Sequence, residues 1–217
     1  FKPRLVASLS ASKYAKNTVV AEFNDKESVK ALFDKYNDKI AAVIVEPVAA
    51  NMGVIPPKDG FLEFLREITK KNNALLIFDE VITGFRLAKG GACEYFGIKP
   101  DLITIGKIVG GGMPLAAYGG KKEIMAHISP LGDVYQAGTL SGNPIATTAG
   151  IATLEVLFQN SGIYANIDEN AKLLAEGIEK IMNKDEKKIH INRVGSLLSV
   201  FFTSKKVECY EDVLSCD

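Results

Sequence analysis

Two residues that could do chemistry, a lysine and an aspartate, each stand at the end of a short apolar run. Lys107 follows the run 102–105 and one glycine, and a glycine triplet begins at Gly110. A lysine buried there is costly as an ammonium ion, and burial lowers its pKa. A neutral lysine amine is the nucleophile that forms a Schiff base with an aldehyde cofactor. From this segment alone, a lysine that extends from a strand end into solvent is an equally open alternative.

The aspartate follows the other apolar run. Residues 74–78 lead directly into Asp79 and Glu80. Continuous apolar runs are typical of parallel strands, which are buried on both faces, and ligands bind beyond the carboxyl ends of such strands. We therefore expect Asp79 and Lys107 at the same edge of a sheet. Asp79 could pair with the protonated pyridine nitrogen of pyridoxal phosphate, and Lys107 could bond to its aldehyde carbon.

An apolar run followed by Asp-Glu is also typical of the magnesium-binding strand of P-loop ATPases. That fold needs the motif Gly-x-x-x-x-Gly-Lys-Ser/Thr to bind phosphates. The motif does not occur in this sequence, and Lys107 is followed by Ile108 rather than by a hydroxyl residue. The ATPase interpretation is therefore disfavoured unless its phosphate loop lies outside this chain.

Four segments resemble the glutamate-1-semialdehyde 2,1-aminomutases, a branch of the class-III aminotransferase family with the type I pyridoxal-phosphate fold. The segments are 45–47, 78–86, 106–114 and 135–144, and the resemblance extends from roughly residue 24 to residue 202. Members of this family are usually about twice as long as this chain, so we interpret the chain as a fragment or as the ordered part of a longer protein. The family's phosphate-binding helix start and substrate-carboxylate arginine are expected outside it.

The resemblance implies a role for five residues. Lys107 would bond to the cofactor aldehyde and then shuttle protons, and Asp79 would pair with the ring nitrogen. Val81 would pack on one face of the ring, with ordinary core packing as the alternative. Thr139 would reach the phosphate of the neighbouring subunit, which implies a homodimer with its active site at the subunit interface. Asn51 would lie near the phenolic oxygen of the cofactor or, equally, tie down a turn.

The resemblance also implies an activity. Such enzymes convert glutamate-1-semialdehyde to 5-aminolevulinate for tetrapyrrole synthesis, use the pyridoxamine phosphate form of the cofactor in the cycle, and need no metal. One alternative is a class-III ω-aminotransferase with a 2-oxo acid acceptor, although segment 135–144 favours the mutase. The other alternative is an incomplete, non-catalytic fragment of either enzyme.

Composition narrows the possible partners. The 217 residues carry 26 basic and 26 acidic side chains, so we expect a small-molecule substrate and neither a nucleic acid nor an anionic membrane surface. No apolar run approaches the roughly 20 residues that span a bilayer. Cys93, Cys209 and Cys216 have no metal-site spacing and are typical of reduced cysteines. We expect a cytoplasmic protein, or a plastid protein if the source is a plant or an alga.

Helix and strand patterns alternate along most of the chain, which predicts the α/β class with a mainly parallel sheet and helices on both faces. The expected large-domain helices are 25–36, 59–71 with Asp59 as N-cap, 92–96 and one from 121, and the expected strands are 40–45, one ending at Asp79, 102–105 and 115–119. Residues 1–161 should form the second half of a cofactor-binding domain that ends with a linking helix, 143–157. Residues 162–217 should form part of a small α+β domain with helix 164–182 and strands 189–192 and 197–202. We assign no function to residues 1–18.

Overall fold

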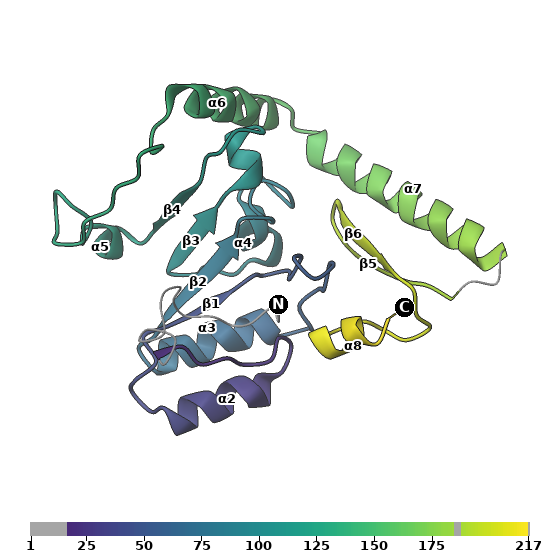
Figure 1. Cartoon of the computed structure of the whole chain (residues 1–217), viewed down its shortest axis with the longest axis horizontal. Helices are drawn as coiled ribbons and strands as arrows, with labels where there is room; N and C mark the ends of the chain where they lie inside the picture. The colour runs from purple at the N-terminus through teal and green to yellow at the C-terminus, as the bar shows by residue number, and fades with distance from the viewer. Residues whose placement is uncertain (1–16, 185–187, 217) are drawn as a thin grey trace.

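The central sheet has four strands in the order β1-β2-β3-β4 (Figure 1). The structure is a computed structural model and describes residues 17–184 and 188–216; residues 1–16, for which the sequence predicts no role, lie outside them. Strands β1 (Ala42–Val45), β2 (Leu75–Glu80) and β3 (Leu102–Ile105) are parallel to one another. Strand β4 (Ala117–Gly120) is antiparallel to β3, because the chain returns without a crossover helix of full length. The predicted α/β class with a mainly parallel sheet is confirmed.

One face of the sheet is more deeply buried than the other. In β2 the residues Leu76, Phe78 and Glu80 are buried, whereas the alternating residues, among them Asp79, are only half-buried. The buried face packs on helix α3 (Phe61–Lys71), and helix α2 (Lys26–Lys35) packs on α3 from outside (Figure 1). The Asp79 face is therefore the more open side of the sheet.

The N-cap of helix α3 lies one residue later than expected, so the prediction of Asp59 as N-cap is wrong. Gly60 is the N-cap, with φ of 71° and no side-chain hydrogen bond. Its left-handed backbone, which glycine adopts at little cost, brings the Phe61 N–H to the Lys58 carbonyl at 2.9 Å. The predicted inward face of this helix is confirmed, because Phe61, Leu62, Leu65 and Ile68 are all buried.

Helices α2 and α6 each begin at a side chain that caps the first N–H groups of the helix. In α2, Asp25 accepts hydrogen bonds from the Glu27 and Ser28 N–H groups, as expected of an N-cap. Asn143 caps α6 (Pro144–Gln159) in the same way, through Ile145 and Ala146. The remaining elements of the sheet unit are α4 (Gly91–Phe96), the 3-10 helix η2 (Lys107–Gly110) and α5 (Lys122–Met125).

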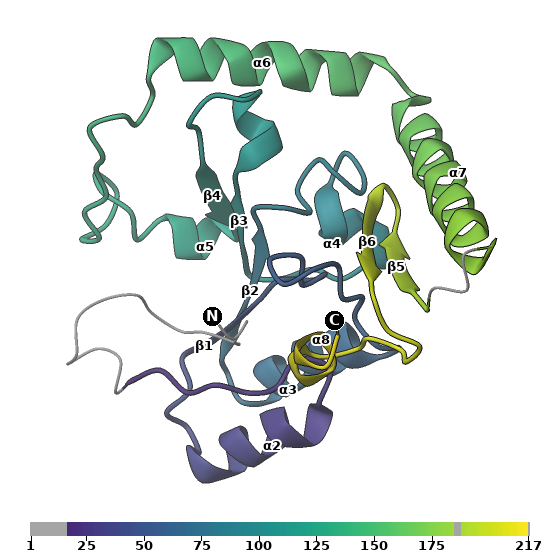
Figure 2. The same ribbon diagram turned by 45° about the vertical axis from the view of Figure 1, so that its right-hand side comes forward.

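The C-terminal part is a long helix followed by a hairpin. Helix α7 (Ile163–Lys184) leads to strands β5 (His190–Val194) and β6 (Leu197–Phe201), which are antiparallel, and then to α8 (Tyr210–Leu214), which the sequence did not predict. The hairpin lies between α7 and α4 (Figure 2), while α6 packs on η2. Within the described ranges, no helix is both long and apolar enough to cross a membrane.

Candidate active site

The strand register aligns three polar side chains at the carboxyl edge of the sheet. Val45 pairs with Phe78, so continuing this register by one residue brings Glu46 beside Asp79. Asp79 in turn pairs with Thr104 on β3. The row Glu46, Asp79 and Thr104 therefore lies on the more open face, where the chains of three strands end.

The Asp79 carboxylate is held through one of its two oxygens. Its Oδ1 accepts hydrogen bonds from the Val81 N–H at 3.1 Å and from the Thr104 hydroxyl at 3.3 Å. Its Oδ2 has no hydrogen-bond partner among the residues that the structure describes. One oxygen thus fixes the carboxylate and the other is available to a ligand.

Lys107 stands where the chain leaves β3. It is the first residue of η2 and has φ of 50°, in the left-handed region that costs a non-glycine residue about 1 kcal/mol. The sequence leaves both a buried and a solvent-exposed Lys107 open, and burial belongs to the role that the resemblance implies; in this chain the residue is exposed. The physical reason is its position: η2 carries it beyond the strand end, on the half-covered side of the sheet.

The pKa of Glu46 responds to the charges of both Asp79 and Lys107, so these three ionisable groups form one electrostatic cluster. Burial raises the pKa of the Glu46 carboxyl above its ordinary value, and the Ala50 N–H, which donates to Oε2 at 3.0 Å, opposes this. The negative charge of Asp79 raises the same pKa further, whereas the positive charge of Lys107 lowers it. Glu46 therefore lies within electrostatic range of both predicted site residues.

Val81 fills the space between the two strand ends. A Cβ atom on Gly106 would lie 3.3 Å from Val81 Cγ1, so the Val81 side chain lies against the glycine that precedes Lys107. Its N–H contacts Asp79, as described above. The structure therefore brings together Asp79, Val81 and Lys107 at one edge.

The structure does not bring the other two predicted residues into this cluster. Asn51 is exposed in the loop between β1 and α3, and Thr139 is exposed between α5 and α6. Across residues 17–184 and 188–216, neither side chain hydrogen-bonds to Asp79 or Lys107. Their assignment to the site stays a prediction.

A second carboxylate, Glu80, was not recognised in the sequence as a structural centre. It is 1% exposed, and its oxygens accept hydrogen bonds from the Ala92 N–H at 2.5 Å, the Cys93 N–H at 3.1 Å, the Cys93 thiol at 2.8 Å and the Thr83 hydroxyl at 3.1 Å. Strand alternation places it opposite Asp79, which is the one signal that the sequence offered. Glu80 thus fixes the start of α4 to the strand that carries Asp79.

An apolar cavity lies elsewhere, between α2 and β1. Its volume is about 550 Å³, and its lining includes Val29, Leu32 and Ile40 but none of the five predicted site residues. Its polar lining residues are Asn17, Tyr36 and Lys39, and no carboxylate lines it to pair with a protonated ring nitrogen. We therefore locate the candidate site at the strand ends and not in this cavity.

Comparisons with known proteins show which family the chain resembles along its length. Residues 2–215 match the family model "Aminotransferase class-III". The glutamate-1-semialdehyde 2,1-aminomutase of Acetivibrio thermocellus is 59% identical over 203 residues, which are 94% of this chain and 46% of that protein. The chain thus spans about half the length of the curated relatives it matches.

Solved structures agree as well. A β-phenylalanine aminotransferase from Variovorax paradoxus superposes with a TM-score of 0.82 at 34% identity, over 90% of this chain and 45% of that chain. A glutamate-1-semialdehyde-aminomutase from Pseudomonas aeruginosa in complex with PMP superposes with a TM-score of 0.78 at 28% identity, over the same shares of the two chains. With the family model covering nearly all of its length, this chain belongs to the class-III aminotransferase family.

Proposed function

We propose that the protein carrying this chain is a pyridoxal-phosphate-dependent aminomutase that converts glutamate-1-semialdehyde to 5-aminolevulinate. The observation that carries the proposal is the meeting of Asp79 and Lys107 at the ends of two adjacent parallel strands. The family membership supports the cofactor, and curated relatives at 52–59% identity support the substrate.

The residues at the edge fit pyridoxal phosphate. Asp79 offers a free carboxylate oxygen to a protonated ring nitrogen, and Thr104 keeps that carboxylate in place. Val81 offers an apolar surface to a flat ring. When bound, the cofactor supplies an aldehyde and an electron-withdrawing ring.

Lys107 has two tasks in this proposal. Its Nζ would hold the cofactor through the aldehyde and, once the substrate amine displaces it, would carry protons to and from the substrate carbons. Both tasks need the neutral amine. Closure of the open face by the rest of the protein would supply it, because water exclusion disfavours the ammonium form.

We propose a homodimer in which Thr139 binds the cofactor phosphate of the partner subunit. The segment around Thr139 exposes large apolar side chains, among them Leu131 at 83% and Tyr135 at 82% exposure, and Ile145 continues this surface onto α6. Apolar patches of this kind mark protein contacts. We place the domain boundary between residues 161 and 162, and Asn51 near the phenolic oxygen of the cofactor.

We place the protein in the cytoplasm. Cys93, Cys209 and Cys216 are free, as is usual in a reducing compartment. The relatives named above are bacterial proteins.

An ω-aminotransferase is the second candidate, favoured by the higher TM-score and identity of the β-phenylalanine aminotransferase structure.

The first experiment tests the site. It adds pyridoxal phosphate to the protein, records the visible absorption of a lysine-linked pyridoxal, traps the link with borohydride and maps the modified peptide. We expect the label on Lys107 and none in Lys107→Ala; a label on another lysine would overturn the site. The second experiment measures 5-aminolevulinate formation without an amino acceptor, and an absolute need for an acceptor would exclude the mutase.

A further inference from the structure

Asn51 lies in a short closed loop between β1 and α3. The Ile55 N–H donates to the Ala49 carbonyl at 2.7 Å, so residues 49–55 form a loop with a fixed base. Asn51 and Gly53 form a bridge within it. The loop therefore presents Asn51, which is exposed, on a backbone of defined shape.

Side chains hold this loop on both sides of Asn51. Before it, the Ala50 N–H donates to Glu46 Oε2 at 3.0 Å. After it, the Val54 N–H donates to the hydroxyl of Ser199 at 2.9 Å, and Ser199 is 145 residues away on β6. Val54 is only 4% exposed, so without Ser199 its N–H would lack water as a replacement partner.

Strand β6 also contacts the tip of the loop. A Cβ atom on Gly53 would lie 2.7 Å from Phe201 Cζ, and Gly53 has φ of 97°. Only glycine gives both the backbone conformation and the space for this contact. The tip of the loop therefore packs directly against β6.

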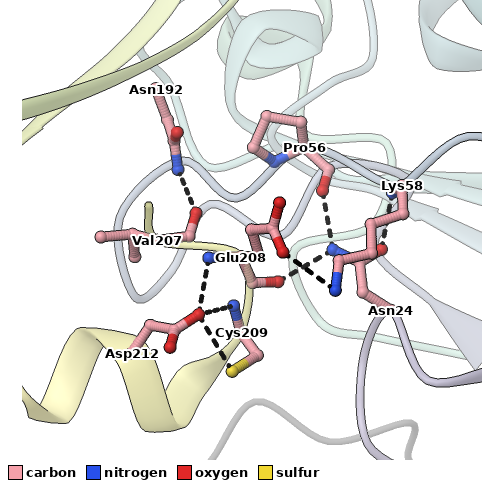
Figure 3. A network of polar contacts seen from close by, with 8 residues as sticks. All are labelled: Asn24, Pro56, Lys58, Asn192, Val207, Glu208, Cys209 and Asp212. Atoms are coloured by element: carbon pink, nitrogen blue, oxygen red, sulfur yellow. Dashed lines mark hydrogen bonds and ion pairs between the residues drawn. The ribbon is translucent and has the colours of Figure 1, made fainter. Parts of the chain in front are cut away.

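A network of polar contacts fixes the segment after β6 to the segment after the loop (Figure 3). Asn24 Nδ2 donates to the carbonyls of Pro56 and Glu208, each at 2.9 Å, and Asn24 Oδ1 accepts from the Lys58 N–H at 2.8 Å. The Lys58 ammonium also pairs with Glu208 at 3.0 Å. One asparagine thus joins the segment after β6 to the segment after the loop.

The hairpin itself is tied to the same segment. On β5, Asn192 Nδ2 donates to the Val207 carbonyl at 2.7 Å, and Asp212 accepts from the Glu208 N–H at 2.9 Å (Figure 3). Asn192 is buried, so its hydrogen bond is shielded from water. The polar network therefore holds Ser199 in place opposite Val54.

We propose that Ser199 is a positioning residue for the active site, which acts by holding the 49–55 loop so that Asn51 points at the cofactor. This inference rests on the proposed function, because it assigns Asn51 to the same site. Among the described residues, the Ser199 side chain makes no hydrogen bond to Asp79, Val81 or Lys107; it acts through the loop backbone.

The test compares Ser199→Ala, which removes the hydroxyl, with Ser199→Thr, which keeps it. Ser204→Ala is the matched control, because Ser204 is exposed and its side chain makes no hydrogen bond within the described ranges. The first readout is hydrogen exchange of the Val54 amide in the cofactor-free protein. We expect exchange about tenfold faster in Ser199→Ala and near wild type in the other two variants. Unchanged exchange in Ser199→Ala overturns the proposal.

The second readout is the affinity for pyridoxal phosphate, titrated by its visible absorption. We expect Ser199→Ala and Asn51→Ala each to weaken binding about threefold to tenfold, and the double variant to be no weaker than Asn51→Ala alone. Additive losses, or a wild-type affinity in either single variant, overturn the positioning role. If the wild-type protein takes up no pyridoxal phosphate, the proposed function fails, and the exchange readout alone decides whether Ser199 holds the loop.

Discussion

Asp79 and Glu80 are consecutive residues of β2, and their carboxylates serve opposite faces of the sheet. Asp79 lies on the half-open face with Thr104, whereas Glu80 is buried against the start of α4. This separation removes the ATPase interpretation of the Asp-Glu pair, because every bond of Glu80 goes to α4 or Thr83 and neither oxygen faces a phosphate site. In the proposed site, Asp79 binds the cofactor, whereas Glu80 holds the start of α4.

The two carboxylates should therefore respond differently to amide substitution. Glu80→Gln places an NH2 group among N–H and O–H donors, so we expect it to lower the free energy of unfolding by about 2–4 kcal/mol. Asp79→Asn should leave stability within about 1 kcal/mol of wild type but weaken pyridoxal phosphate binding at least about tenfold. Urea titration and absorption titration measure the two effects. Equal stability losses in both variants would contradict this division of roles.

The hydroxyl of Thr104 should matter through Asp79. Thr104→Val keeps the shape of the side chain and removes the donor to Asp79 Oδ1. Loss of one hydrogen bond to a charged group predicts a drop in pyridoxal phosphate affinity of about fivefold to tenfold. Thr148→Val is the control, because Thr148 is exposed and donates within its own helix, to the Pro144 carbonyl. A wild-type affinity in Thr104→Val would show that Val81 alone orients the carboxylate.

Local sequence patterns predicted most helices and strands and the common sheet edge of Asp79 and Lys107. They did not predict the contacts between elements that lie far apart in the sequence. The apolar runs before Asp79 and after Asp101 predicted β2 and β3 correctly. Parallel strands are buried on both faces, so their sequences are continuous apolar runs that are easy to recognise. Side-chain chemistry predicts Asp59 as the N-cap of α3, but Gly60, with its left-handed backbone, is the N-cap.

The contacts that fix the site are long-range, and no periodicity encodes them. Ser199 and Val54 are 145 residues apart, and Asn24 and Glu208 are 184 residues apart. Glu80 could be placed on the inner face by alternation, but three of its four donors come from the fold of α4 and the fourth from the turn at Thr83. The apolar run before Lys107 leaves open whether this lysine is buried, and the backbone of η2 carries it outward.

The thiol of Cys93 should react slowly with alkylating reagents, because it is partly buried and donates a hydrogen bond to Glu80. Burial, followed by the hydrogen bond to Glu80 and its negative charge, raises the pKa of the Cys93 thiol far above its ordinary value. At pH 8 we expect alkylation by iodoacetamide to be at least about tenfold slower at Cys93 than at Cys216, followed by peptide mass spectrometry. Glu80→Gln should speed labelling of Cys93 and leave Cys216 unchanged. Fast labelling of Cys93 in the folded wild type would contradict the contact.

Asp101 should make the stability of the sheet sensitive to acid. It is 3% exposed at the edge opposite the site, where it accepts from the Leu76 N–H at 2.7 Å and pairs with Arg66 at 2.9 Å and Lys121 at 2.5 Å. Burial opposes ionisation of this carboxyl, but the Leu76 N–H, Lys121 and Arg66 together outweigh it, and its pKa lies below the ordinary 3.8. The unfolded chain therefore binds the proton more tightly than the folded protein.

The sign of the pH dependence follows from that difference. The stabilisation by Asp101 is complete above about pH 5 and is lost as the pH falls through 3.8 towards the lower folded pKa. Asp101→Asn should lower the free energy of unfolding by about 2–3 kcal/mol at pH 7 and lose less stability than wild type between pH 5 and pH 3. Lys121→Gln should cost less than about 1 kcal/mol, because that lysine is half exposed. Urea titrations at pH 7, 5, 4 and 3 measure both variants, and parallel pH profiles for Asp101→Asn and wild type would rule out Asp101 as the acid-sensitive group.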